Sequence, residues 1–70
     1  NDARIYYLRG WAYAYENKLN MAIDDYSRSI GLDPDHAGAY YNRGLAHKHL
    51  GDESRARADM DKGRELGFED

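Results

Sequence analysis

The feature that most constrains this chain is an internal repeat with one fixed spacing. The stretch Tyr-Tyr-Leu-Arg-Gly-Trp-Ala at residues 6–12 returns 34 residues later, at residues 40–46, as Tyr-Tyr-Asn-Arg-Gly-Leu-Ala. Further residues keep the same offset, among them Asp25 and Asp59. An echo with a constant offset and no gap indicates two copies of one structural unit.

The spacing of apolar residues within each copy predicts helices. We expect four of them, over about 3–16, 19–32, 36 or 37 to 50, and 53–66. Asp2 and Asp52 are expected to cap the first and fourth helices, and Pro34 to end the second. Asn17 and Gly51 suit the left-handed turn that follows a helix. Because short connections make neighbouring helices antiparallel, the predicted fold is all-α, an α-solenoid of two helix-turn-helix units.

Small residues at matching positions predict where the helices of each unit cross. Gly10 is expected to meet Ala22 in the first unit, and Gly44 to meet Ala56 in the second. Small side chains let two helix axes approach at or below the usual spacing of about 8–10 Å. Since glycine costs about 1 kcal/mol relative to alanine inside a helix, its recurrence there indicates a packing reason.

This pattern resembles the tetratricopeptide repeat, a helix-turn-helix unit of 34 residues. In that family the first helix carries a large aromatic residue, a Gly and a Tyr, the second carries an Ala and an aromatic residue, and a Pro closes the unit. The first copy here has Tyr6, Gly10, Tyr13, Ala22, Tyr26 and Pro34. The second copy has Tyr40, Gly44, His47, Ala56, Met60 and Phe68.

The resemblance covers essentially the whole chain and implies one domain over residues 1–70. Repeat one is expected at about 3–36 and repeat two at about 37–70. A chain of this length buries only about 60% of the surface that its unfolded form exposes, so its stability is marginal. Because the sequence begins with Asn1 rather than Met, we expect a fragment or a processed product.

The two ends of the repeat pair differ in polarity. Ile23 and Ile30 in the second helix become Arg57 and Arg64 in the fourth, at positions that pack against the next repeat in such arrays. Buried, unpaired arginines would be costly. The last helix therefore resembles a solvated end cap. The apolar first helix is expected to be covered by an earlier repeat or by a second copy.

The resemblance implies a binding scaffold rather than an enzyme, with a concave groove for a peptide or partner helix. Aromatic stripes form helix cores more often than binding sites, so core packing stays open for Tyr7 and Trp11. The alternative function is structural self-association through the first helix, by homo-oligomerisation or hairpin exchange. The groove positions carried over from the family are Tyr7, Trp11, Tyr15, Tyr41, Asn42, Leu45, Lys48 and His49.

Some family members hold the C-terminal carboxylate of a chaperone with a clamp of Lys, Arg and Asn residues. Asn42 matches one clamp Asn, but Tyr7 and Trp11 stand where the first-repeat Lys and Asn belong. We therefore do not expect that ligand. The partner implied is another protein or peptide, or a second copy of the chain.

Charge and composition bear on whether the partner is a nucleic acid or a membrane. Ten Lys plus Arg against thirteen Asp plus Glu give a net charge of −3, which argues against nucleic acid or an anionic membrane as partner. RNA binding through Arg4, Arg9, Arg43 and the tyrosines is the third alternative. There is no cysteine, and no apolar run approaches the ~20 residues that span a bilayer.

Neither a cofactor nor a metal is expected. His47 and His49 lie two apart on a helix, so their rings point roughly 200° apart and cannot share one ion. His47 fits a packed histidine better. Asp25 and Asp59 are expected to pair with nearby arginines on a wet surface, where such pairs are worth at most ~1 kcal/mol each.

Overall fold

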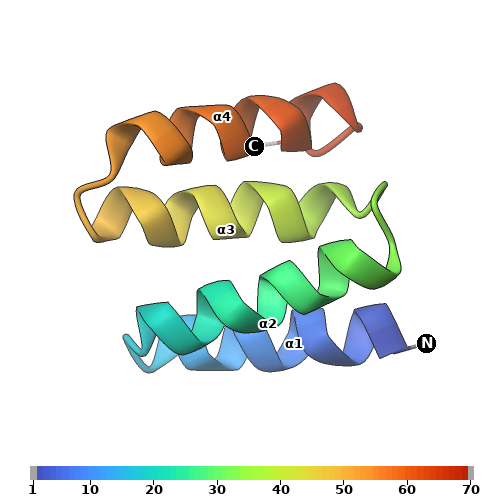
Figure 1. Cartoon of the computed structure of the whole chain (residues 1–70), viewed down its shortest axis with the longest axis horizontal. Coiled ribbons are helices and arrows are strands. Elements are labelled where there is room, and N and C mark those ends of the chain that lie inside the picture. The colour runs from blue at the N-terminus through green and yellow to red at the C-terminus, as the bar shows by residue number, and fades with distance from the viewer. Residues whose placement is uncertain (1, 70) are drawn as a thin grey trace.

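The computed structural model describes residues 2–69, which form four helices (Figure 1). The helices are α1 (Asp2–Tyr15), α2 (Leu19–Leu32), α3 (Ala37–His49) and α4 (Glu53–Glu65). The all-α prediction is confirmed, and every helix bound lies within one residue of its predicted place. The predicted domain limits include residues 1 and 70, which lie outside the described residues.

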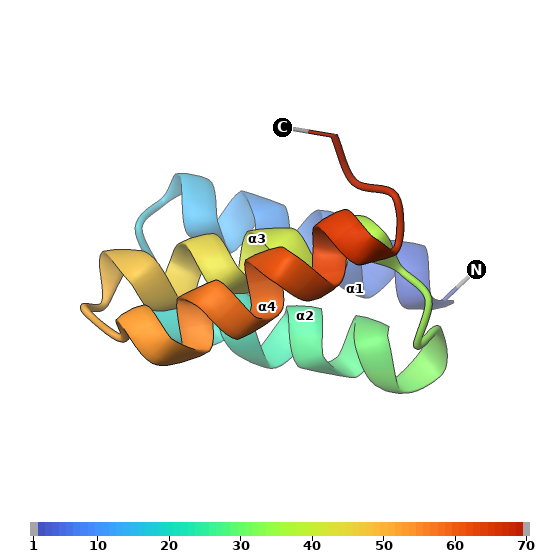
Figure 2. The same ribbon diagram turned by 90° about the horizontal axis from the view of Figure 1, so that it is seen from above.

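The helices form two layers, with α1 and α3 on one side and α2 and α4 on the other (Figure 2). The molecule measures 31 × 27 × 19 Å. Its shortest dimension therefore matches two helix diameters of about 10 Å each. Packing runs from α1 to α2, α2 to α3 and α3 to α4, with a smaller contact between α1 and α3. Within residues 2–69, no Cα atom of α2 lies within 8 Å of a Cα atom of α4.

The first hairpin closes at Gly10, as predicted. A Cβ atom on Gly10 would lie 2.9 Å from the Tyr26 ring and 3.3 Å from the Ala22 carbonyl oxygen, and both of those residues are fully buried. Nearer the start of α1, the buried Ser29 hydroxyl donates to the Ala3 carbonyl at 2.8 Å. A tight crossing and this buried hydrogen bond both hold α2 against α1.

The second hairpin closes at Gly44 in the same way. A Cβ atom there would lie 2.7 Å from Met60 Cγ and 2.9 Å from the Ala56 carbonyl oxygen. Gly63 adds a second close approach, since its Cβ would lie 2.9 Å from the Tyr41 backbone nitrogen. Both predicted crossings are therefore confirmed, and α3 and α4 meet backbone to backbone at two points.

Left-handed residues end three of the helices. Asn17, Gly51 and Gly67 have φ values of 63°, 86° and 109°. After α1, the Lys18 N–H donates to the Tyr13 carbonyl at 2.8 Å, which satisfies a carbonyl of the last turn. These turns explain why α1, α3 and α4 each stop one residue before the predicted bound.

Side chains cap the N-terminal ends of α3 and α4. His36 Nδ1 accepts from the Ala39 N–H at 3.2 Å, and the Asp52 carboxylate accepts from the Arg55 N–H at 3.1 Å. The predicted Asp52 cap is confirmed. Asp2, in contrast, lies within the first turn of α1 rather than capping it, because the helix begins one residue earlier than predicted.

The carboxylates of two ion pairs are buried, whereas the prediction placed Asp25 and Asp59 on a wet surface. Arg9 donates to both carboxylate oxygens of Asp25, at 2.6 and 2.9 Å, and Arg43 does the same to Asp59, at 2.7 and 2.9 Å. Asp25 is 1% exposed and Asp59 is 9% exposed. The partners were predicted correctly, but the two-bond geometry satisfies each carboxylate well enough for burial.

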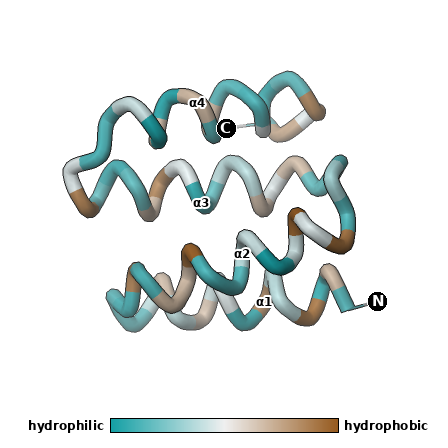
Figure 3. The backbone as a smooth tube through the Cα atoms, in the orientation of Figure 1, coloured by the Kyte–Doolittle hydropathy of each residue, from teal (hydrophilic) through white to brown (hydrophobic). Residues whose placement is uncertain are grey.

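Exposed apolar side chains gather on α1. Ile5, Leu8, Trp11 and Tyr15 are all more than half exposed. Figure 3 shows α4 as largely hydrophilic, and its Arg57 is exposed. The predicted contrast between an uncovered α1 and a polar α4 is therefore present. In residues 2–69, none of the helices combines the length and the apolar character needed to cross a membrane.

Candidate functional site

A hollow of about 230 Å³ lies between the C-terminal halves of α1 and α3, with α2 behind it. It brings together five of the eight predicted groove residues and four others. The predicted residues are Trp11, Tyr15, Asn42, Leu45 and His49, and the additional ones are Ala14, Leu19, Tyr26 and Ala46.

Trp11 and Tyr15 form the α1 wall of this hollow. Their rings stack with centroids 5.7 Å apart and planes 17° apart, as side chains four residues apart on a helix can do. Trp11 is 53% exposed and Tyr15 is 82% exposed. The wall is thus a paired aromatic surface that solvent reaches.

Tyr7 lies deeper and joins the two helical pairs. Asn42 Nδ2 donates to the Tyr7 hydroxyl at 2.9 Å, and the Tyr7 ring lies 4.6 Å from the His36 ring. A Cβ atom on Gly38 would lie 2.9 Å from the same hydroxyl. Tyr7 therefore packs α1 against α3 instead of lining the hollow.

Tyr41, which was predicted to line the groove, is buried and does not line the α1–α3 hollow. It is 9% exposed and stacks on Phe68, with ring centroids 4.3 Å apart and planes 17° apart. Figure 2 shows the segment after α4 turning toward the side on which α1 and α3 lie. Phe68 thereby covers Tyr41.

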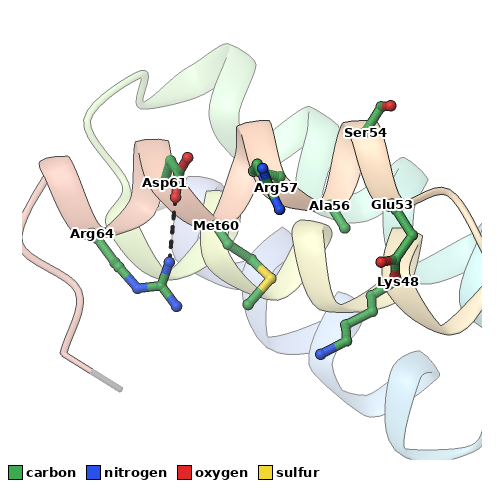
Figure 4. Close-up of a pocket in the computed structure, with 8 residues that line it drawn as sticks. All are labelled: Lys48, Glu53, Ser54, Ala56, Arg57, Met60, Asp61 and Arg64. Atoms are coloured by element: carbon green, nitrogen blue, oxygen red, sulfur yellow. Dashed lines mark hydrogen bonds and ion pairs between the residues drawn. The ribbon is translucent and has the colours of Figure 1, made fainter.

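Lys48 lines a different hollow, of about 350 Å³, beside α4 (Figure 4). Met60 lies among charged side chains there, and Arg64 donates to Asp61 at 3.3 Å. Arg57 and Arg64 hold the positions that Ile23 and Ile30 hold in α2. The rim of this hollow is Lys48, Glu53, Ser54, Arg57, Asp61 and Arg64, a charged surface that suits solvent.

Comparison with models of known protein families identifies the family of this chain. A family model described as TPR repeat matches residues 10–51, more than half of the chain, and one described as Tetratricopeptide repeat matches residues 37–66. The chain belongs to the tetratricopeptide repeat family. Tetratricopeptide repeats generally mediate interactions with proteins or peptides, and the family is typically a non-enzymatic scaffold. A search of curated proteins found no match.

Tyr26 is the site residue that sequence reasoning missed. Its position in the tetratricopeptide repeat predicted only a core aromatic residue beside Gly10. The side chain lines the hollow and is fully buried, and its hydroxyl has no hydrogen-bond partner among the described residues. Burial raises the pKa of this hydroxyl well above its usual range, so it stays a neutral donor. The available signal was a tyrosine at a core position, since a buried phenol normally requires a partner.

The histidines of the second tetratricopeptide repeat lie apart. His47 packs near the buried carboxylate of Asp59, with Nε2 3.8 Å from Oδ2, whereas His49 lines the hollow. Across residues 2–69, no group of three or more His, Cys, Asp or Glu side chains is arranged to hold a metal ion.

Proposed function

We propose that this chain is a protein–protein interaction module that binds a peptide or partner helix in the hollow between α1 and α3. The observation that supports this is the stacked, solvent-accessible pair of Trp11 and Tyr15 facing Leu45 and His49 across the hollow. Exposed aromatic side chains that are already held by neighbours make strong anchors, because little conformational freedom is lost on binding.

The dimensions of the hollow set the kind of ligand. A volume of about 230 Å³ lies below the range of typical small-molecule pockets, about 300–1,000 Å³. It suits one or two side chains of a longer partner. The rest of a peptide would lie along α1 and α3, as an extended strand or an amphipathic helix does in a groove.

A displayed peptide library screened against the 70-residue chain tests this proposal. Synthetic peptides from the enriched clones should bind the Trp11→Ala variant at least about tenfold more weakly, because an aromatic anchor is worth about 2 kcal/mol or more. Leu32→Ala is the matched control, since Leu32 is 56% exposed but does not line the hollow. Equal affinity of both variants would contradict the proposed site.

A second candidate function is self-association through the outer face of α1. The Arg9 side chain is 53% exposed, whereas its counterpart Arg43 is 22% exposed and donates to Ser27 of the preceding helix at 3.2 Å. Ile5 is 63% exposed and Leu8 is 52% exposed on the same face. The outer face of α1 is therefore open to solvent, whereas the corresponding face of α3 packs against α2.

Mass in solution tests this second candidate. If two copies cover each other's α1, light scattering should report a dimer that Ile5→Asp converts to a monomer, since a charge cannot be buried there unpaired. Leu32→Asp, at an exposed site on α2, serves as the control and should leave the mass unchanged. A wild-type chain that stays monomeric at high concentration excludes this function.

A further inference from the structure

The contact between α2 and α3 joins the two repeats, and Arg43 spans it. Arg43 Nε and Nη2 donate to Asp59 of their own repeat, whereas Nη1 donates to the Ser27 hydroxyl of α2 at 3.2 Å. Ile23 of α2 and His47 of α3 line one hollow together with the Ser27 and Arg43 side chains. The two helices therefore meet in a defined register, in which Ser27 lies opposite Arg43.

The first repeat has the same arginine with one nitrogen unused. Arg9 Nε and Nη2 donate to Asp25, but Arg9 Nη1 makes no hydrogen bond within residues 2–69. On the same helix Ile5 is 63% exposed, whereas its counterpart Ala39 in α3 is fully buried. α1 thus leaves a donor and an apolar surface open at the positions where α3 is covered.

The outer face of α4 carries an acceptor at the matching position. Asp61 follows Ser27 by one period of 34 residues, and its side chain is 65% exposed. One carboxylate oxygen accepts from Arg64 of the same helix at 3.3 Å (Figure 4), and the other can serve a second donor. α4 therefore offers a carboxylate where α2 offers a hydroxyl, and a carboxylate is the stronger acceptor for a guanidinium group.

We propose that copies of this chain stack head to tail, with α4 of one copy against α1 of the next in the register that α2 and α3 use. Arg9 Nη1 of the second copy donates to the Asp61 carboxylate of the first. Arg57, one period after Ile23, lies over the ring of Tyr13, which is one period before His47. This inference rests on the second candidate function, self-association through α1, because it names the surface that α1 meets.

The apolar side chains of the two faces also match. Tyr26 of α2 and Asn42 of α3 line one hollow at the contact between the repeats. Their counterparts one period away are Met60, which lines the hollow beside α4, and Leu8, which is 52% exposed on α1. A smaller side chain on α4 thus meets a wholly apolar one on α1, and contact with a second copy removes both from water.

The arginine on α4 is compatible with this contact. Burying an arginine is costly where it has no partner, but the face of an aromatic ring attracts a guanidinium group. The fold already uses this pairing, since the Arg43 guanidinium lies 5.6 Å from the centre of the Tyr40 ring. Tyr13 is half-buried on α1 and offers Arg57 a ring of the same kind.

Growth of the stack is the first test, because a contact between two different faces does not close on itself. The α4 face of the second copy stays open for a third, whereas a pair joined α1 to α1 stops at two chains. In light scattering over a concentration series, the mass of the 70-residue chain should rise past that of two chains. A mass that stops at two chains overturns the stack and leaves self-association through α1 standing, and a mass that stays at one chain overturns both.

A charge reversal on α4 tests the register. Asp61→Arg places a positive charge opposite Arg9 of the next copy and should weaken association at least about tenfold, because facing like charges repel. Glu65→Arg is the matched control, since Glu65 lies on the same helix and is 73% exposed but does not line the hollow beside α4. Equal effects of the two reversals would count against the proposed contact.

Two blocked chains distinguish the stack from every symmetric pair. Ile5→Asp closes the α1 face and Asp61→Arg closes the α4 face, and each variant alone should be monomeric. Their equimolar mixture should form a complex of one chain of each, because the first supplies an intact α4 face and the second an intact α1 face. Circular dichroism confirms that both variants fold. A mixture of folded variants that stays monomeric overturns the inference.

Discussion

The two repeats contain the same ion pair, each with a buried carboxylate, in two different settings. Arg9 and Asp25 in the first repeat, and Arg43 and Asp59 in the second, keep nearly identical distances of 2.6 to 2.9 Å. Yet the Arg9 side chain is 53% exposed and the Arg43 side chain only 22%. The repeat unit fixes the pair, whereas the helix packed in front of it decides how far the pair is withdrawn from water.

The two repeats also differ in how tightly their helices cross. The atoms that a Cβ on Gly10 would approach most closely belong to the Tyr26 ring, at 2.9 Å, with backbone no closer than 3.3 Å. At Gly44 the crowding includes backbone atoms, the Ala56 carbonyl oxygen at 2.9 Å and the Met60 nitrogen at 3.0 Å. A side chain can shift slightly, but backbone atoms can move only if the two helices separate.

The largest expected effect therefore comes from Gly44→Ala. We expect it to lower the free energy of unfolding by about 2–3 kcal/mol, as overpacking a tight contact does. Gly10→Ala should cost about 1 kcal/mol, because the Tyr26 ring can shift and alanine gains about 1 kcal/mol of helix propensity. Urea denaturation of both variants measures the difference. Equal losses would show that the two crossings are equivalent.

The next largest difference in stability between the repeats is expected from variants of the two ion pairs. Among residues 2–69, Arg43→Leu leaves the buried Asp59 carboxylate with only His47 nearby, at 3.8 Å. The variant should cost about 2 kcal/mol, the value of hydrogen bonds to a buried charge. Arg9→Leu should cost less, because Arg28 still donates to Asp25 at 3.1 Å. Thermal unfolding of the two variants ranks them. A larger loss for Arg9→Leu would contradict the protective role assigned to Arg28.

Much of this architecture could be predicted because it follows from local chemistry. Glycine at a crossing, Asn17 at a left-handed turn, Pro34 after a helix and Asp52 at a helix start each act within a few residues of their own position. The second repeat supports the same interpretation, because Gly44 occupies the position that Gly10 occupies in the first. These features gave the helix bounds and both crossings from the sequence.

The places of the individual groove residues could not be read from the sequence, because they depend on distant neighbours. Tyr41 is buried by Phe68, and nothing in the repeat pattern sets the direction of the chain after α4. Lys48 and His49 are adjacent, but the helix turns by about 100° between them, so one lines the α4 hollow and the other the α1–α3 hollow. Tyr26 reaches the site from the second helix, which the family pattern assigns to the core.

The pH dependence of stability tests the first repeat's ion pair alone. The hydrogen bond from Arg9 holds the pKa of Asp25 below its ordinary value of about 4, against the opposing effect of burial. A lowered folded-state pKa stabilises the chain above pH 4, and this contribution is lost as the pH falls through the lowered value. Asp25→Asn should remove this part of the acid sensitivity in chemical denaturation measured from pH 6 to pH 2. An unchanged acid profile in that variant would contradict the assignment.

The smallest expected effect distinguishes the two left-handed turns at the ends of α1 and α3. Asn17 and Gly51 are one period apart, with φ values of 63° and 86°. A Cβ on Gly51 would have no neighbour within 4 Å, so Gly51→Ala adds backbone strain without a clash and should cost about 1 kcal/mol. Asn17→Gly should change stability by only a few tenths of a kcal/mol, because asparagine tolerates this conformation. Urea midpoints measure both, and a Gly51→Ala chain as stable as the wild type would show that the turn at the end of α3 relaxes out of the left-handed region.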